Sequence, residues 1–129
     1  MFDYTVTTSK NINEAISSLE LKLTEEKFGV LWMFDIKEKL QEKGLEFESD
    51  YLVLEVCNPH EAERVLKENL LVGYFLPCKI VVYSDNGKTK IGMPRPTALI
   101  NLINNEEIKR LAKDIEERLI QCINKSIQS

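Results

Sequence analysis

The tripeptide Asp85-Asn86-Gly87 is the sequence feature that most constrains the fold. Asn-Gly and Asp-Gly pairs favour the tight turns that join neighbouring antiparallel strands. The segments on either side, residues 79–83 and 88–93, carry strand patterns. The chain is therefore expected to contain an antiparallel hairpin, and with it a mixed or mainly antiparallel sheet.

Three more strands are expected ahead of this hairpin. Residues 2–8 alternate between apolar and polar side chains, which is typical of a half-buried strand. Residues 30–34 form a continuous apolar run, which predicts a strand buried on both faces with Trp32 and Met33 in the core. Residues 51–57 give the clearest strand pattern, with one wholly apolar face.

Helices are expected between and after the strands. Capping patterns predict helices that begin after Asn11, Asp35 and Asn58, the last with a proline in its first position. A long final helix over about residues 105–127 follows from apolar side chains at helical spacing. The order βαβ(α)βαββα, with about five strands, indicates a single α+β domain over residues 1–129.

Two short segments are less regular. Residues 70–76 are apolar but contain Gly73, so either a tight loop over the core or the start of the next strand fits. Residues 97–103 are expected to form a short helical turn.

Composition excludes several classes of protein. A net charge of −4 argues against a general nucleic-acid binder. No apolar run approaches the roughly 20 residues that span a membrane, and the N-terminus lacks signal-peptide character. A cytoplasmic location with reduced thiols is therefore expected. Three cysteines and one histidine do not predict a disulfide framework or a metal site.

Two cysteines that lie near prolines are the first candidates for chemistry. Cys57 precedes Asn58-Pro59 at the end of a strand, near a helix N-terminus whose partial positive charge can lower a thiol pKa. Cys78 opens the next strand. The two thiols meet if their strands are antiparallel or if the intervening segment carries the chain back. Otherwise both are small buried side chains.

Other polar residues near this segment have simpler roles. Glu55 shares a strand face with Cys57, and it either lines a pocket or points to solvent. Asn58 serves as a helix cap. His60 is expected to be exposed and is a weak candidate for a base. Arg95 lies between two prolines and is expected on the surface, where an anion or a partner subunit could meet it.

Three motifs resemble domain-of-unknown-function family 302: EVCNP at residues 55–59, GYFLPCKIVVY at residues 73–83 and FDYTVTTSK at the start. The resemblance covers about residues 2–96 and leaves the final helix unmatched. It implies a small cytoplasmic α+β domain, often dimeric, with no established activity. It also implies that relatives carry cysteines at the positions of Cys57 and Cys78.

These observations favour a non-catalytic module that binds a small ligand or a partner, is homodimeric and has its site near Glu55, Cys57, Asn58 and Cys78. The alternative is a thiol-based redox or sulfur-handling protein, with Cys57 as nucleophile and Cys78 as the assisting thiol. A third hypothesis is an interaction domain whose final helix forms the dimer. The chain carries no glycine-rich phosphate loop and no nucleophile elbow, and it identifies no cofactor.

Overall fold

The structure of the chain is a computed structural model that describes residues 1–128. Five antiparallel strands form one sheet in the order β1-β5-β4-β3-β2. The strands are β1 (Asp3–Thr8), β2 (Gly29–Asp35), β3 (Tyr51–Cys57), β4 (Cys78–Asp85) and β5 (Lys88–Pro94). The helices are α1 (Ile12–Glu25), α2 (Ile36–Glu42), α3 (Pro59–Glu68), the 3₁₀ helix η1 (Leu70–Phe75), α4 (Pro96–Ile100) and α5 (Glu106–Ser126). The predicted α+β class and element order are confirmed.

The β4–β5 hairpin has the turn that its sequence predicts. Asp85 lies opposite Lys88, so the loop contains only Asn86 and Gly87. These two residues have φ angles of 52° and 78°. Positive φ at both central positions is the mark of a type I′ turn, whose twist matches that of the two strands.

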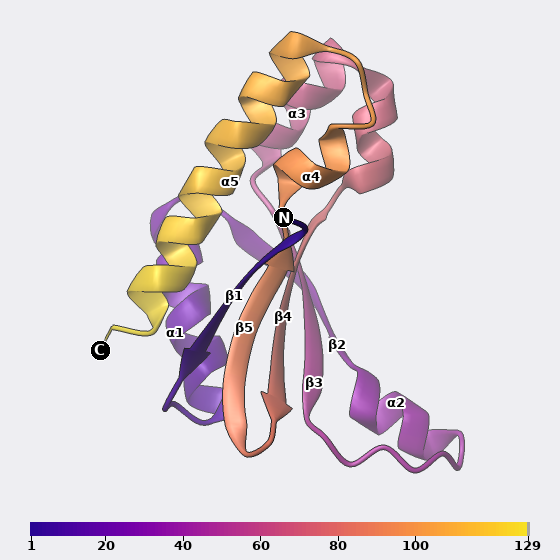
Figure 1. Cartoon of the computed structure of the whole chain (residues 1–129), viewed down its shortest axis with the longest axis vertical. Coiled ribbons are helices and arrows are strands. Elements are labelled where there is room, and N and C mark those ends of the chain that lie inside the picture. The colour runs from indigo at the N-terminus through magenta and orange to yellow at the C-terminus, as the bar shows by residue number, and fades with distance from the viewer. Residues whose placement is uncertain (129) are drawn as a thin grey trace.

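Helices α1 and α5 cover one face of the sheet and leave the other face uncovered (Figure 1). The core lies between them, because apolar side chains from the inner sheet face meet the apolar stripes of both helices. Its fully buried members include Leu19, Leu54, Ile80, Val82, Ile91 and Leu119.

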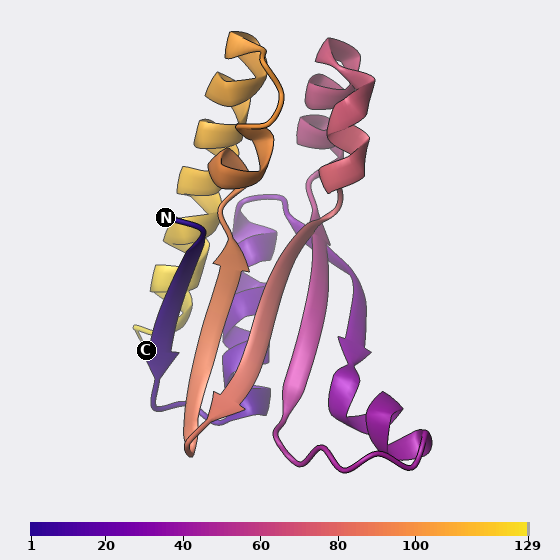
Figure 2. The same cartoon turned by 45° about the vertical axis from the view of Figure 1, so that its right-hand side comes forward.

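Helices α3, η1 and α4 project beyond one end of the sheet, together with the N-terminal half of α5 (Figure 2). The segment at residues 70–76, whose form the sequence left open, is mainly the 3₁₀ helix η1. None of the helices in residues 1–128 combines the length and apolar character needed to cross a membrane.

Arg118 on α5 connects three separate elements. Its guanidinium lies 2.6 Å from a carboxylate oxygen of Glu61 on α3 and 3.5 Å from the carboxylate of Glu26 after α1. It also lies over the ring of Phe28, 5.2 Å from the centroid. Because the three contacts converge on one side chain, α5 fixes the position of α3 relative to the sheet.

The expectation that residues 30–34 are buried on both faces is wrong. β2 is an edge strand without a neighbour on its outer side within residues 1–128. Trp32 is 55% exposed and Met33 is 44% exposed, so neither belongs to the core. A short apolar run is compatible with a buried strand, but the place of that strand in the sheet depends on distant pairing that periodicity does not encode.

Arg95 is also not the plain surface cation that was expected. Its guanidinium lies 3.2 Å from Glu116 on α5 and donates to the backbone carbonyl of Asp3. Glu116 is buried, and its second oxygen accepts hydrogen bonds from the backbone N–H and the hydroxyl of Thr97. This carboxylate therefore ties α5 to the start of α4 and to the N-terminal strand.

We predict that Glu116→Ala lowers the free energy of unfolding by about 3 kcal/mol, because Arg95 and Thr97 lose their shared partner in a buried setting. Urea denaturation followed by circular dichroism measures the change. Glu117→Ala, at the exposed neighbouring position, is the control and should change stability by less than about 0.5 kcal/mol. Equal effects of the two substitutions would contradict the assigned role of Glu116.

Candidate functional site

The sheet divides between β4 and β5 at the end that carries α3 and α4. The β4–β5 pairing ends at Val81 opposite Gly92. On either side the pairing continues, because Cys78 still lies opposite Val56 of β3 and Pro94 opposite Asp3 of β1. From Val81 back to Cys78, therefore, β4 remains paired with β3, and from Gly92 to Pro94, β5 remains paired with β1. The two strands diverge from each other over these residues (Figure 2).

Three prolines account for this division. Continuing the hairpin register past Val81 and Gly92 would place Lys79 opposite Pro94 and Pro77 opposite Pro96. Proline has no backbone N–H, so three of these four positions supply no donor to a ladder. The peptide bond between Leu76 and Pro77 is cis.

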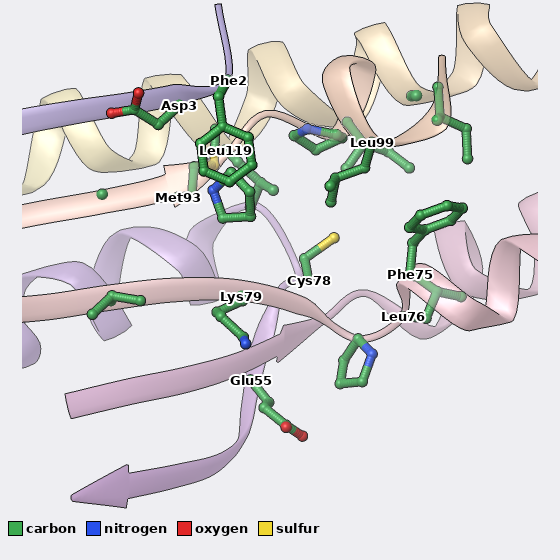
Figure 3. Close-up of a pocket in the computed structure, with 18 of the residues that line it drawn as sticks. Phe2, Asp3, Glu55, Phe75, Leu76, Cys78, Lys79, Met93, Leu99 and Leu119 are labelled. Atoms are coloured by element: carbon green, nitrogen blue, oxygen red, sulfur yellow. The ribbon is translucent and has the colours of Figure 1, made fainter. Parts of the chain in front are cut away.

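The division opens into a cleft of about 700 Å³. We refer to it as the β4–β5 cleft. Figure 3 shows Met93, Leu99 and Leu119 on one side of it and Phe75 and Leu76 on the other. Most of the lining is apolar, and its buried members include Val65, Val72, Met93, Ile100, Ile108 and Leu119. Volume and lining are those of a small-molecule site.

Cys78 lies at the centre of this cleft. It opens β4 at the point where the strand leaves β5, and its side chain points from β4 into the space between Met93 and Phe75 (Figure 3). Its cross-strand partner Val56 is fully buried, so both side chains lie on the helix-covered side of the sheet.

Glu55 and Cys57 lie on the uncovered side of the sheet, since side chains alternate along β3 and Val56 between them faces the core. Glu55 faces Lys79 across the strands, and both border the cleft. Cys57 is half-buried and is not among the lining residues. The antiparallel topology therefore brings Cys57 and Cys78 to the same end of the sheet, but on opposite faces.

Asn58 lies outside the cleft and has a structural role. Its side-chain oxygen accepts from the backbone N–H groups of His60 and Glu61, which caps α3. Its amide donates to the carbonyl of Glu26 at 3.4 Å. His60 is exposed in the first turn of α3, as expected.

All three thiols are held in the protonated form. Burial raises the pKa of the Cys78 thiol from its ordinary value of 9.0 to about 11, and nearby Cys57 adds to the rise. Burial likewise raises the pKa of Cys57, and it raises that of Cys122 to about 11. Because the thiolate is the reactive form, these environments count against an activated nucleophile.

A disulfide between Cys57 and Cys78 would need the backbone to move. Both are free cysteines. Their side chains leave neighbouring strands toward opposite faces of the sheet, whereas a disulfide requires Cβ atoms that approach to about 4 Å. Within residues 1–128, no group of three His, Cys, Asp or Glu side chains is arranged to hold a metal ion.

The sequence alone does not predict most of the cleft lining. Phe2, Phe75, Met93 and Leu99 come from four separate segments, and each has an ordinary apolar pattern. Only the prolines indicate from the sequence where the pairing of β4 with β5 ends. A two-residue turn at Asn86-Gly87 fixes the hairpin register, and that register alone sets Pro77 opposite Pro96.

We predict that Cys78 is alkylated slowly at neutral pH. A pKa of about 11 in place of 9.0 leaves a thiolate fraction about a hundredfold lower at pH 7.5. Its rate with iodoacetamide, read by mass spectrometry, should therefore keep rising above pH 9. The urea-unfolded chain is the control and should level off near the ordinary thiol pKa. A plateau below pH 8 in the folded protein would contradict this account and favour the thiol-based alternative.

Comparison with known proteins assigns the family. A family model described as "Domain of unknown function DUF302" matches residues 4–126, which includes α5. The chain is also similar to a solved structure, the crystal structure of an uncharacterized conserved protein DUF302 from Bacillus stearothermophilus. The two are 59% identical over 98% of each chain, with a TM-score of 0.96. No curated protein matches the chain. The chain therefore belongs to the DUF302 family, as its EVCNP and GYFLPCKIVVY motifs predicted.

Proposed function

We propose that this protein is a non-catalytic module that binds a small apolar ligand in the β4–β5 cleft and acts as a homodimer. The observation that carries the proposal is the cleft itself, about 700 Å³ in volume and lined mainly by apolar side chains. An apolar cavity with a few polar groups at its border is the usual form of a small-molecule site.

The polar residues of the cleft support binding more than catalysis. Glu55, Lys79 and Asp3 lie at its border. The Cys78 thiol in its wall is protonated at neutral pH because burial raises its pKa to about 11. A protonated thiol adds a soft, polarizable surface to an apolar site. We place the protein in the cytoplasm, where its three free cysteines stay reduced.

The homodimer proposal rests on the uncovered face of the sheet. An apolar row crosses this face from Phe34 through Val53 and Val81 to Gly92, since these residues lie opposite one another in register. Trp32 stacks on Phe34 at one end of the row, and Tyr51 packs against Tyr83 beside it; the ring centroids are 5.2 Å apart in each pair.

Charge and size favour a second copy of this chain on that face. Glu55 and Lys79 lie side by side there, so the face carries both signs and can pair with itself in a two-fold arrangement. Five strands about 4.8 Å apart and roughly 20 Å long give about 500 Å² before side-chain relief. Over two copies this is about 1,000 Å² in total, the lower bound for a biological interface. The second copy would also cover the part of the cleft bordered by Tyr51 and Tyr83.

We predict that Leu99→Trp weakens binding of a neutral apolar dye. Leu99 lines the cleft, and an indole in its place fills the cavity. Titration with Nile red, followed by its fluorescence, should show at least a tenfold loss of affinity. The matched control is Leu102→Trp, at a position that is 87% exposed and outside the cleft. Unchanged binding by Leu99→Trp would contradict the proposed site.

We also predict that Trp32→Glu converts the dimer to a monomer, because it places a charge beside the apolar row in both copies. Sedimentation velocity at about 20 μM measures the mass. Leu21→Glu is the control, since Leu21 is similarly exposed but lies on α1, and it should remain dimeric. A monomeric wild-type chain at this concentration would overturn the homodimer.

A further inference from the structure

The direction of the backbone groups at the sheet division follows from two hydrogen bonds. The N–H of Ser84 on β4 donates to Asp50, on the β3 side, at 2.9 Å. The N–H of Arg95 donates to Phe2, on the β1 side, at 2.8 Å. Because backbone groups alternate along a strand, Lys79 directs its N–H and C=O toward β5, and Pro94 directs its own backbone atoms toward β4.

Pro94 therefore cannot donate a hydrogen bond to the carbonyl oxygen of Lys79. A regular rung at this position would exchange two hydrogen bonds, one of them from residue 94 to the carbonyl oxygen of Lys79. Pro94 has no N–H to give, so within residues 1–128 the Lys79 carbonyl has no partner from the β5 ladder. Pro77 and Pro96 continue the same row without donors, and all four residues line the cleft.

Charge around the cleft disfavours an anion. Of its described lining residues, Lys79 alone carries a positive charge, against the carboxylates of Asp3 and Glu55. The Asp3 carboxylate accepts a hydrogen bond from the Thr5 hydroxyl at 2.6 Å. No ion pair is formed by Glu55 or Lys79 within the described chain. The chain as a whole has a net charge of −4, which opposes anions further.

We infer that the ligand of the β4–β5 cleft is an apolar molecule that carries a protonated amine, which donates a hydrogen bond to the carbonyl oxygen of Lys79. This inference rests on the proposed binding function and adds the chemistry of the polar group. The apolar body lies between Met93 and Leu99 on one side and Phe75 on the other. The amine replaces the donor that Pro94 lacks, and the excess of carboxylates over lysine among the lining residues favours a cation over an anion.

Three probes with one apolar body test the inference: 4-phenylbutylamine, butylbenzene and 4-phenylbutanoate. Each is titrated into the ¹⁵N-labelled full chain, and the amide shifts of Cys78, Lys79 and Met93 report binding at the cleft. We expect the amine to bind at least tenfold more tightly than the hydrocarbon, and the carboxylate to bind most weakly. Equal binding of the amine and the hydrocarbon overturns the inference and leaves the proposed function intact. Tighter binding of the carboxylate also overturns it. Absence of shifts with all three probes overturns both.

A substitution at Pro94 tests the hydrogen bond itself. Pro94→Ala supplies an N–H opposite the Lys79 carbonyl and so removes the need for a donor from the ligand. We expect the preference for the amine over butylbenzene to fall at least fivefold, while the amide introduced at position 94 is protected from hydrogen exchange. Pro59→Ala, at the first position of α3 and outside the cleft, is the control. A preference unchanged by Pro94→Ala overturns the role of this carbonyl.

Discussion

The shape of this molecule depends on three prolines, each of which lacks the backbone N–H that a sheet ladder needs. Pro77, Pro94 and Pro96 would occupy consecutive rungs between β4 and β5, and none can donate to the other strand. The hairpin therefore pairs only as far as Val81 and Gly92, and past that point its strands separate. A continuous ladder would leave no room for the cleft, since strands in a sheet lie only about 4.8 Å apart.

Divergence of the strands would expose the core unless other elements covered the gap. Each strand continues directly into a helical segment on its own side: β5 into α4, and η1 leads into β4. Helix α5 holds the two sides together, because Glu116 binds Arg95 and Thr97 at the start of α4 while Arg118 binds Glu61 on α3. The two walls of the cleft therefore come from separate segments, and both are bound to α5.

The same arrangement separates the two cysteines that the sequence singles out. Antiparallel pairing brings them to one end of the sheet, but the alternation of β3 puts Cys57 on the uncovered side and Cys78 within the cleft. Each thiol is partly or wholly removed from water, so each has a raised pKa. The resulting site is suited to holding an apolar molecule against sulfur, and poorly suited to nucleophilic chemistry.

Local chemistry made most of the fold predictable. Asn86-Gly87 specifies its turn by backbone conformation, and Asn11 and Asn58 mark helix starts by the hydrogen bonds that they make. The exposure of Trp32 is not predictable from local sequence, because it depends on which strand lies at the sheet edge.

The cleft is likewise a product of register between segments that are distant in sequence, and the apolar pattern of each segment gives no sign of it. The candidate residues Glu55 and Cys78 border it, while Cys57 and Asn58 do not.

A crystal structure of the protein under xenon pressure would test this account most directly, since xenon enters apolar cavities without needing any polar partner. We expect xenon in the cleft between Met93, Leu99 and Phe75, with β4 and β5 unpaired beyond Val81 and Gly92. A structure with no xenon there, and with Lys79 and Pro94 packed against each other, would contradict it.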